Sequence, residues 1–304
     1  MLPASWRIGV EAIVLDRDRG ASHLALDALA VLSKAGTEAT QDHAGFLSLV
    51  ELARSLRSAR PSMPVISNLV NLAMNDALGG SASDVVSRVA RTAAAARERA
   101  TEARSAAAKN AAAIARGVVL THSASETVTK ALRAAARGGQ LTRVVVAEGR
   151  PGLEGRELAR AIAAEGVEVV LVVDAALGLH AREADLALVG ADAVLSDGAL
   201  VNKVGTRLLA LACERAGTPL YAATDRFKVS SSSTLPLEEK ASAEVWSDPP
   251  PGVGVRNIYF DRTEATLVTS YATDAGMLKP SDVGKLALEH AAWAGWETRL
   301  RRLR

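Results

Sequence analysis

The 304-residue sequence contains a single cysteine, Cys213, so no disulfide framework can form within the chain and a reducing cytoplasm is the expected compartment. The formal net charge is only +2, which gives no strong reason to expect direct nucleic acid binding or an anionic membrane. No stretch approaches the roughly 20 apolar residues that span a bilayer. The charges near the N-terminus are too early and too frequent for a secretory signal. The histidines lack metal-ligand spacing, so we expect no metal site. We also expect no cofactor.

Aromatic residues are also scarce, at 3% of the chain, whereas hydrophobic residues make up 49% and charged residues 23%. Such a composition is that of a globular protein, and the length is sufficient for about two domains. Cys213 lies in an apolar helical pattern, and we expect it to be a small core residue.

The character of the sequence changes near Gly117. Before it, apolar residues recur at helical spacing, and residues 84–116 contain no glycine or proline and are rich in alanine, arginine and glutamate. After it, short apolar runs alternate with amphipathic helical patterns, which predicts a parallel, doubly wound sheet. We therefore predict an α/β protein in which a helical N-terminal part precedes a doubly wound parallel sheet. The expected strands are 118–120, 144–146, 167–173, 186–189 and 220–222; the expected helices between them are 126–136, 155–164, 176–184 and 204–216; a last helix is expected over 282–304.

Residues 188–206 form the most informative segment. An apolar run predicts the end of a buried strand, Asp192 follows where the chain leaves the sheet, and Asn202 and Lys203 come before a helical pattern. In open α/β sheets ligands bind outside the carboxyl ends of strands, where helix N-termini offer N–H groups to anions. The segment therefore predicts a carboxylate, an amide and an ammonium group at an anion-binding edge of the sheet.

The residues Gly190-Ala191-Asp192 and Asn202-Lys203-Val204-Gly205-Thr206 resemble the "GAD … NKxGT" signature of a known family. It comprises the alpha, beta and delta subunits of translation initiation factor 2B, ribose-1,5-bisphosphate isomerase and methylthioribose-1-phosphate isomerase. The resemblance extends over nearly the whole chain, and it implies an N-terminal helical domain over residues 1–116 followed by a Rossmann-like domain over residues 117–304. Its other motifs are Arg19-Gly20-Ala21-Ser22, Arg60-Pro61-Ser62, the stretch 121–125, Glu148-Gly149-Arg150-Pro151, Phe227-Lys228 and the architectural turn 257–261.

The resemblance implies a phosphorylated ligand. Arg19 with Gly20, Ala21 and Ser22 is similar to the element that holds a substrate phosphate in the isomerases, and a guanidinium suits phosphate oxygens. Arg60, Lys203 and Lys228 complete the implied set of cations. Arg150 and Asn202 are also expected to contact the ligand. Each residue has a structural alternative, such as a solvated side chain at a helix end or an ion pair at a strand end.

The stretch Thr121-His122-Ser123-Ala124-Ser125 separates the branches of the family. This stretch resembles a motif of the isomerases that reads THCN. The cysteine of that motif works with the aspartate of GAD to move a proton between adjacent carbons. A thiol can be tuned towards neutral pH, whereas a serine hydroxyl needs a partner to act as a base. This chain has Ser123 at that position, and adjacent strand residues point to opposite faces, so His122 is not an obvious activating base.

Three hypotheses follow. The first, which we favour, is a non-catalytic protein of the initiation factor 2B alpha type that binds a phosphorylated sugar or nucleotide and acts through assembly with other subunits. The second is an aldose-ketose isomerase with Asp192 as acid/base and Ser123, or a water, in the cysteine's place. The third is an oligomeric scaffold, which would leave the four cations unexplained. The resemblance implies a ligand in the cleft between the domains and a homodimer, or a hexamer, formed through the α/β domain.

Overall fold

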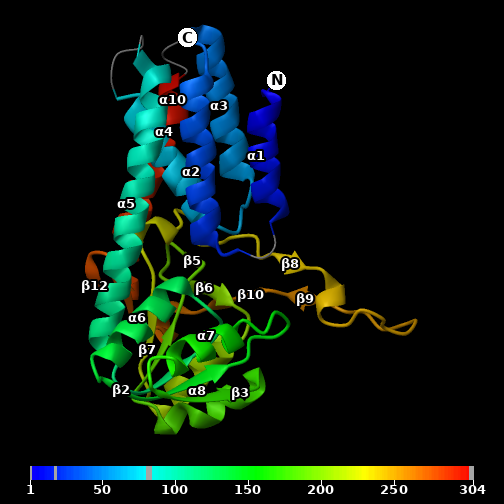
Figure 1. Cartoon of the computed structure of the whole chain (residues 1–304), viewed down its shortest axis with the longest axis vertical. Helices are drawn as coiled ribbons and strands as arrows, with labels where there is room; N and C mark the ends of the chain where they lie inside the picture. The colour runs from blue at the N-terminus through cyan, green and yellow to red at the C-terminus, as the bar shows by residue number, and fades with distance from the viewer. Residues whose placement is uncertain (1, 17–18, 80–83, 301–304) are drawn as a thin grey trace. The chain divides into compact units, whose positions relative to one another are not determined.

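The computed structural model describes residues 2–16, 19–79 and 84–300 (Figure 1). By its internal contacts the chain forms two units, and each is described by itself. The helical unit comprises residues 1–102, 227–235 and 284–304, and the α/β unit comprises residues 103–226 and 236–283. These units are defined by contacts and not by independent folding, so the predicted domain boundary at residue 116 stays a prediction.

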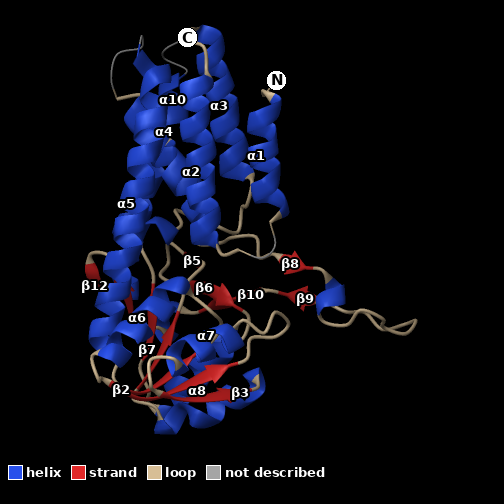
Figure 2. Cartoon of the chain, viewed as in Figure 1, coloured by secondary structure: helices blue, strands red, loops and turns tan. Residues whose placement is uncertain are grey.

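The helical unit is built from helices (Figure 2). These helices are amphipathic and bury their apolar faces against one another. On the second helix Leu24, Ala28 and Leu32 are fully buried at a spacing of four residues, as a single helical face requires. Asp42 begins the third helix by accepting a hydrogen bond from the Gly45 N–H at 2.8 Å. The helices are α1 (Ala4–Leu15), α2 (Ala21–Glu38), α3 (His43–Ser58), α4 (Pro64–Ala77), the N-terminal part of α5 (Val85–Ile114), most of α9 (Val283–Ala294), and α10 (Trp296–Leu300).

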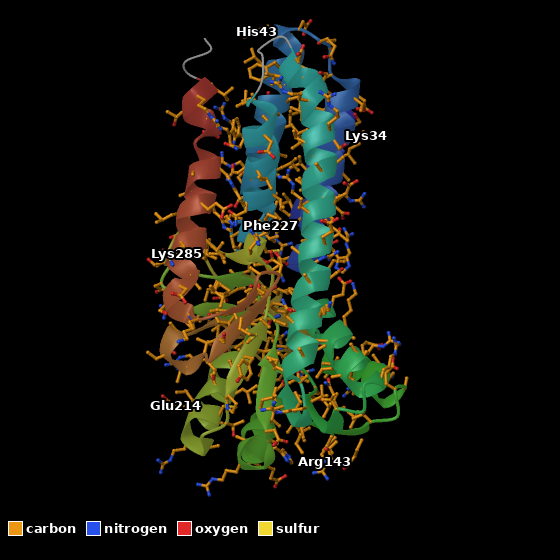
Figure 3. The ribbon with its side chains drawn as sticks, turned by 90° about the vertical axis from the view of Figure 1, so that its left-hand side faces the viewer. Lys34, His43, Arg143, Glu214, Phe227 and Lys285 are labelled. Atoms are coloured by element: carbon orange, nitrogen blue, oxygen red, sulfur yellow. The ribbon has the colours of Figure 1, made fainter. Side chains whose placement is uncertain are left out.

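The sequence predicts one C-terminal helix, but the structure has two, because Gly295 separates α9 from α10. The Nε1–H group of buried Trp296 donates to Asn71 Oδ1 at 2.9 Å, which fixes the start of α10 within the helical unit. The predicted basic end of this helix, residues 301–304, lies outside the described residues. The same unit contains Phe227 (Figure 3). Its ring centroid lies 6.1 Å from that of Trp293.

The α/β unit contains a seven-stranded sheet with the order β12-β11-β7-β4-β1-β2-β3. All neighbouring pairs are parallel except β11 and β12. The strand order changes direction between β1 and β4, so their adjacent carboxyl ends form a topological switch point. The strands are β1 (Gly117–Thr121), β2 (Leu141–Ala147), β3 (Glu168–Val172), β4 (Leu186–Val189), β7 (Leu220–Ala223), β11 (Ser270–Thr273) and β12 (Gly276–Leu278).

Helices cover the sheet as a doubly wound fold requires, and the predicted fold class is confirmed. The C-terminal part of α5, α6 (Glu126–Arg137) and α7 (Gly155–Ala163) pack with β1, β2 and β4 in one apolar core. The helix predicted over 176–184 is instead a 3-10 helix, η2 (Asp174–Glu183), which packs against α8 (Thr206–Ala216). Cys213 on α8 is fully buried, and this burial raises the pKa of its thiol to about 11, so its predicted place in the core is confirmed.

Two small sheets complete the α/β unit. The informative segment folds as the end of β4, then a hairpin of β5 (Ala193–Val194) and β6 (Leu200–Lys203), and then the start of α8. β6 also pairs with β10 (Phe260–Thr263), and β8 (Glu239–Lys240) pairs with β9 (Asn257–Ile258), all antiparallel. Among the described residues, no helix combines the length and apolarity needed to cross a membrane.

Candidate functional site

The switch point brings two predicted site residues to one edge of the sheet. Ser123 follows β1 by two residues, and Asp192 follows β4 by three. The two connections touch, because a Cβ atom at Gly190 would lie only 2.6 Å from Ser125 Cβ. Glycine at position 190 therefore permits this approach at the place where open α/β sheets bind their ligands.

The hydroxyl of Ser123 is held by a carboxylate that the sequence analysis missed. Ser123 Oγ donates to Glu154 Oε1 at 3.0 Å. Ser123 has a φ of 65°, a left-handed conformation that is unusual for a residue with a side chain. Glu154 occupies the N-cap position of α7, yet its side chain does not cap that helix. Instead, the carboxylate reaches the chain that follows β1.

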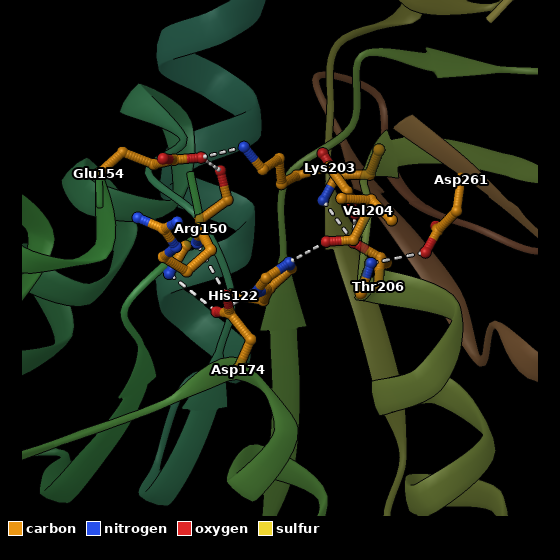
Figure 4. A network of polar contacts seen from close by, with 12 residues as sticks. His122, Arg150, Glu154, Asp174, Lys203, Val204, Thr206 and Asp261 are labelled. Atoms are coloured by element: carbon orange, nitrogen blue, oxygen red, sulfur yellow. Dashed lines mark hydrogen bonds and ion pairs between the residues drawn. The ribbon is translucent and has the colours of Figure 1, made fainter. Parts of the chain in front are cut away.

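Glu154 also forms an ion pair with Lys203 at the end of β6 (Figure 4). Lys203 Nζ lies 3.1 Å from the same oxygen, Oε1, and the lysine side chain is only 3% exposed. The ammonium also lies 3.7 Å from the centre of the Tyr259 ring, where the ring quadrupole attracts a cation. Lys240 Nζ lies 3.6 Å from the same ring centre. The predicted residues Ser123 and Lys203 are thus brought together through Glu154.

Two polar atoms of this group make no hydrogen bond within the described part of the chain. They are Glu154 Oε2 and Lys203 Nζ, and both are buried. Glu154 Oε2 lies beside two glycines, since added Cβ atoms at Gly149 and Gly152 would approach it to 3.2 and 2.8 Å. The carboxylate and the ammonium therefore retain hydrogen-bonding capacity beyond their ion pair.

His122 does not activate Ser123. Its Nε2 lies 2.7 Å from the Val204 carbonyl oxygen, which can only accept, so Nε2 carries the proton. Its Nδ1 lies 3.8 Å from Asp174 Oδ1. Asp174 in turn accepts hydrogen bonds from the backbone N–H groups of Gly149 and Arg150, at 2.8 and 2.7 Å. His122 therefore connects the loops around the site, and the partners of its two ring nitrogens are Val204 and Asp174 rather than the serine hydroxyl.

The N-terminus of α8 is not available to an anion, contrary to the sequence-based expectation. Asp261 on β10 accepts hydrogen bonds from the N–H groups of Gly205 at 2.7 Å and Arg207 at 3.1 Å. Burial raises the pKa of Asp261, and these backbone hydrogen bonds act in the opposite direction. The positive end of the helix dipole thus already interacts with a carboxylate of the chain itself.

The other predicted residues of the α/β unit have structural contacts. Asn202 is buried, and its Nδ2 donates to Thr206 Oγ1 at 3.0 Å. The backbone N–H of Asp192 donates to the Val201 carbonyl at 2.9 Å, which places Asp192 at the base of the β5–β6 hairpin. Arg150 is exposed, and its guanidinium donates to the Val245 carbonyl at 3.4 Å.

The helical unit brings together two of its three predicted cations. Gly20 is the N-cap residue of α2, followed by buried Ala21 and half-buried Ser22. The Arg19 guanidinium forms ion pairs of 2.7 Å with Asp16 and with Asp27, and both carboxylates raise its pKa. Buried Arg60 donates to the carbonyl oxygen of the same Asp16, so the two arginines share one partner residue.

The third cation of the helical unit, Lys228, is buried at the end of the 3-10 helix η3 (Arg226–Lys228). The segment around it is fixed by buried Asn68, whose Nδ2 donates to the carbonyl groups of Phe227 and Val229, each at 2.8 Å. Within the described ranges, no group of three His, Cys, Asp or Glu side chains is placed to hold a metal ion.

The residues that sequence reasoning missed are Glu154, Asp261 as a helix cap, and Tyr259. One signal for Glu154 is the cluster of glycines at 149, 152 and 155 directly after a predicted strand. A Cβ atom at Gly155 would lie 1.9 Å from the Ala147 carbonyl oxygen, so the chain turns back closely against β2 there. Such a turn at the carboxyl end of a strand marks a site more clearly than the charge of Glu154 does.

Comparison with known proteins agrees with the sequence motifs. The model of the initiation factor 2 subunit family matches residues 17–280. A Pyrococcus furiosus protein described as translation initiation factor "eIF-2B subunit 2-like" is 34% identical over 285 residues, 92% of this chain and 98% of that protein. The ribose 1,5-bisphosphate isomerase of Methanocaldococcus jannaschii is 30% identical over 181 residues, 58% of this chain and 59% of that protein. The crystal structure of the Pyrococcus horikoshii translation initiation factor eIF-2B, at 29% identity, matches with a TM-score of 0.78 over 92% of this chain and 98% of that chain. The chain therefore belongs to the initiation factor 2 subunit family.

Proposed function

We propose that this chain binds a phosphorylated sugar or a nucleotide without isomerising it, as an initiation factor 2B alpha-like protein. The supporting observation is the hydrogen bond from Ser123 Oγ to Glu154 Oε1, because Ser123 stands at the position of the cysteine in the isomerase motif. A thiol can ionise near neutral pH, and its thiolate can accept a proton. A carboxylate beside the Ser123 hydroxyl disfavours a second negative charge, so the hydroxyl keeps its proton. Ser123 then acts as a hydrogen-bonding group.

The polar residues divide into two kinds of contact. We assign Arg19 and Arg60 with Lys228 to the phosphate, with Gly20, Ala21 and Ser22 at the start of α2 as its backbone contacts. Arg19 would exchange a carboxylate partner for the phosphate, which a guanidinium binds through two parallel hydrogen bonds. Ser123, Asn202 and Lys203 are assigned to the rest of the ligand, with Arg150 beside them. That the ligand lies in the cleft between the domains stays a prediction.

Thermal unfolding tests this proposal directly. Ribose 1,5-bisphosphate and methylthioribose 1-phosphate at 1 mM are expected to raise the Tm, because a ligand at about a hundred times its Kd adds about 2.7 kcal/mol to stability. Lys228→Met is expected to reduce this shift. The matched control is Lys34→Met, which removes an exposed lysine paired with Glu38 on α2. If neither compound nor any common nucleotide changes the Tm, the binding function is refuted.

An aldose-ketose isomerase remains the second candidate, because a carboxylate lies 3.0 Å from Ser123 Oγ and Asp192 follows the neighbouring strand. In that reaction one group removes a proton from the carbon next to the carbonyl, and another group returns a proton to the adjacent carbon. The assay follows ketose formation from the two sugar 1-phosphates. Turnover that is lost in Asp192→Asn would replace the binding-only proposal with the enzyme. Tight binding with no ketose formed would exclude the enzyme.

We also propose that the chain is a cytoplasmic homodimer, or a hexamer, formed through the α/β unit. Support comes from large apolar side chains exposed on β3, η2 and α8 and at the residue between β3 and η2. They are Leu171, Val173, Leu179 and Leu208, which are 43%, 58%, 79% and 71% exposed. Sedimentation of the double variant Leu179→Asp/Leu208→Asp is expected to give a monomer. The control is Ile8→Asp, which changes a 63% exposed apolar residue of the helical unit. A wild-type chain that sediments as a monomer at micromolar concentration would refute the dimer.

A further inference from the structure

We propose that Glu154 and Lys203 bind two neighbouring hydroxyl groups of the ligand's sugar, and that Glu154 makes the site selective for ribose over 2-deoxyribose. This inference rests on the proposed function, since it assigns the sugar end of the same ligand. In a ribose ring phosphorylated on C5, the hydroxyls on C2 and C3 form such a neighbouring pair. The same pair is present in a ribonucleotide.

The charges of the group favour an uncharged partner over a phosphate. Lys203 Nζ is buried, and its charge is already balanced by Glu154 at 3.1 Å and by the face of the Tyr259 ring at 3.7 Å. A phosphate placed on Lys203 would bring its negative charges close to the Glu154 carboxylate, which opposes binding. Hydroxyl groups carry no charge and meet no such repulsion. This moves Lys203 from the phosphate end of the ligand to the sugar end.

The unused hydrogen-bonding capacity matches a pair of hydroxyls. Glu154 Oε1 accepts from Ser123 Oγ and faces Lys203, whereas Oε2 has no hydrogen-bond partner among the described residues. Lys203 Nζ likewise makes no hydrogen bond there. One hydroxyl can donate to Oε2 while its neighbour accepts from Nζ, so the acceptor and the donor are both satisfied. A 2-deoxy sugar leaves one of these buried groups without a partner.

The backbone is strained at the two places that build this pair. Ser123, with a φ of 65°, and Leu153, with a φ of 58°, are the non-glycine residues with positive φ in the described chain. The first supplies the hydroxyl on Glu154 Oε1, and the second directly precedes Glu154. Residues in this conformation persist where the surrounding structure holds them, and they gather at ligand sites. Both strained residues therefore point to the Glu154 carboxylate as the feature being positioned.

Calorimetric titration with matched probes tests the inference. Wild-type protein is titrated with ribose 5-phosphate, 2-deoxyribose 5-phosphate, AMP, 2′-deoxy-AMP and inorganic phosphate. The ribose forms are expected to bind about 10 to 100 times more tightly than the deoxy forms, the range for a lost hydrogen bond to a charged group. In Glu154→Gln this preference is expected to fall to about twofold or less. The same variant is expected to bind inorganic phosphate as well as wild type or better, because Lys203 regains its net positive charge.

The control is Glu165→Gln, which removes another carboxylate of the α/β unit, one paired with Arg133 and Arg137, and should keep the preference. Equal binding of ribose and deoxyribose forms by wild type, which needs no variant, overturns the inference and leaves the proposed function standing. Loss of inorganic phosphate binding in Glu154→Gln also overturns it, since the residue would then serve the whole site. If no probe binds wild type, this inference fails, and the thermal unfolding experiment with ribose 1,5-bisphosphate and methylthioribose 1-phosphate decides the proposed function separately.

Discussion

Removal of the Asp261 carboxylate gives the sharpest test of how the α/β unit uses the start of α8. In the structure this side chain accepts hydrogen bonds from the N–H groups of Gly205 and Arg207. Asp261→Ala leaves these donors at a helix N-terminus without their partner. We expect the variant to be less stable than wild type and, at the same time, to gain an anion-binding helix end.

The expected loss in the free energy of unfolding follows from two contributions of opposite sign. Losing a helix cap costs about 0.5–2 kcal/mol, and losing hydrogen bonds to a charged acceptor costs about 1.5–3 kcal/mol, two measures of one interaction. Burial raises the pKa of Asp261, so removing the charge recovers part of its desolvation. We therefore expect a net loss of about 2 kcal/mol. For a domain of 150–250 residues this lowers the Tm by about 4–8 °C.

Scanning calorimetry in chloride and in sulfate buffers measures both effects. Sulfate is expected to restore part of the lost Tm in Asp261→Ala, beyond its general effect on wild type, because the freed N–H groups bind the anion. Asp261→Asn, which keeps one acceptor oxygen, should lose about half as much stability and gain less from sulfate. Amide hydrogen exchange at Gly205 and Arg207 locates the change. An unchanged Tm with unchanged exchange at these two amides would show that the carboxylate is not the cap of α8.

Three further predictions concern stability. Its arginine partners lower the pKa of Glu165 to about 2, so its contribution to the free energy of unfolding is complete above pH 4.5 and is lost as the pH falls towards 2. In urea unfolding at a series of pH values, Glu165→Gln should therefore reduce the fall in stability between pH 4.5 and pH 2. Burial raises the pKa of Cys213 to about 11, so stability should fall by up to about 1.4 kcal/mol per unit as pH rises from 9 to 11, and Cys213→Ala should remove this part. Asn68→Ala leaves two buried carbonyls of residues 227–229 without their donor and should cost about 2 kcal/mol in urea unfolding, whereas an unaffected midpoint would contradict that hydrogen-bonding role.

Most of the fold was predictable from the sequence because its signals are local. The alternation of apolar runs with amphipathic patterns after Gly117 corresponds to the parallel sheet and its helices, and the lack of glycine and proline in residues 84–116 corresponds to α5. The prediction was wrong where contacts distant in sequence decide. Of the predicted helix 176–184, residues 176–183 form part of a 3-10 helix that packs against α8, where a Cβ atom at Gly178 would lie 3.0 Å from Ala212.

At the candidate site, too, contacts between residues distant in sequence limited the prediction. Ser123 and Lys203 are recognisable by their motifs, but the residue that joins them lies at a helix start, where a glutamate is ordinary and its side chain is expected to face the helix N–H groups. Glu154 turns away from that role because the turn at Gly149–Gly155 and the left-handed Leu153 aim it at the end of β1. A motif that supplies an ammonium indicates phosphate only while that charge is unbalanced. Once Glu154 is in contact with Lys203, the same lysine favours an uncharged, hydroxyl-bearing group, and the chemistry of the site is set by a residue outside the motif.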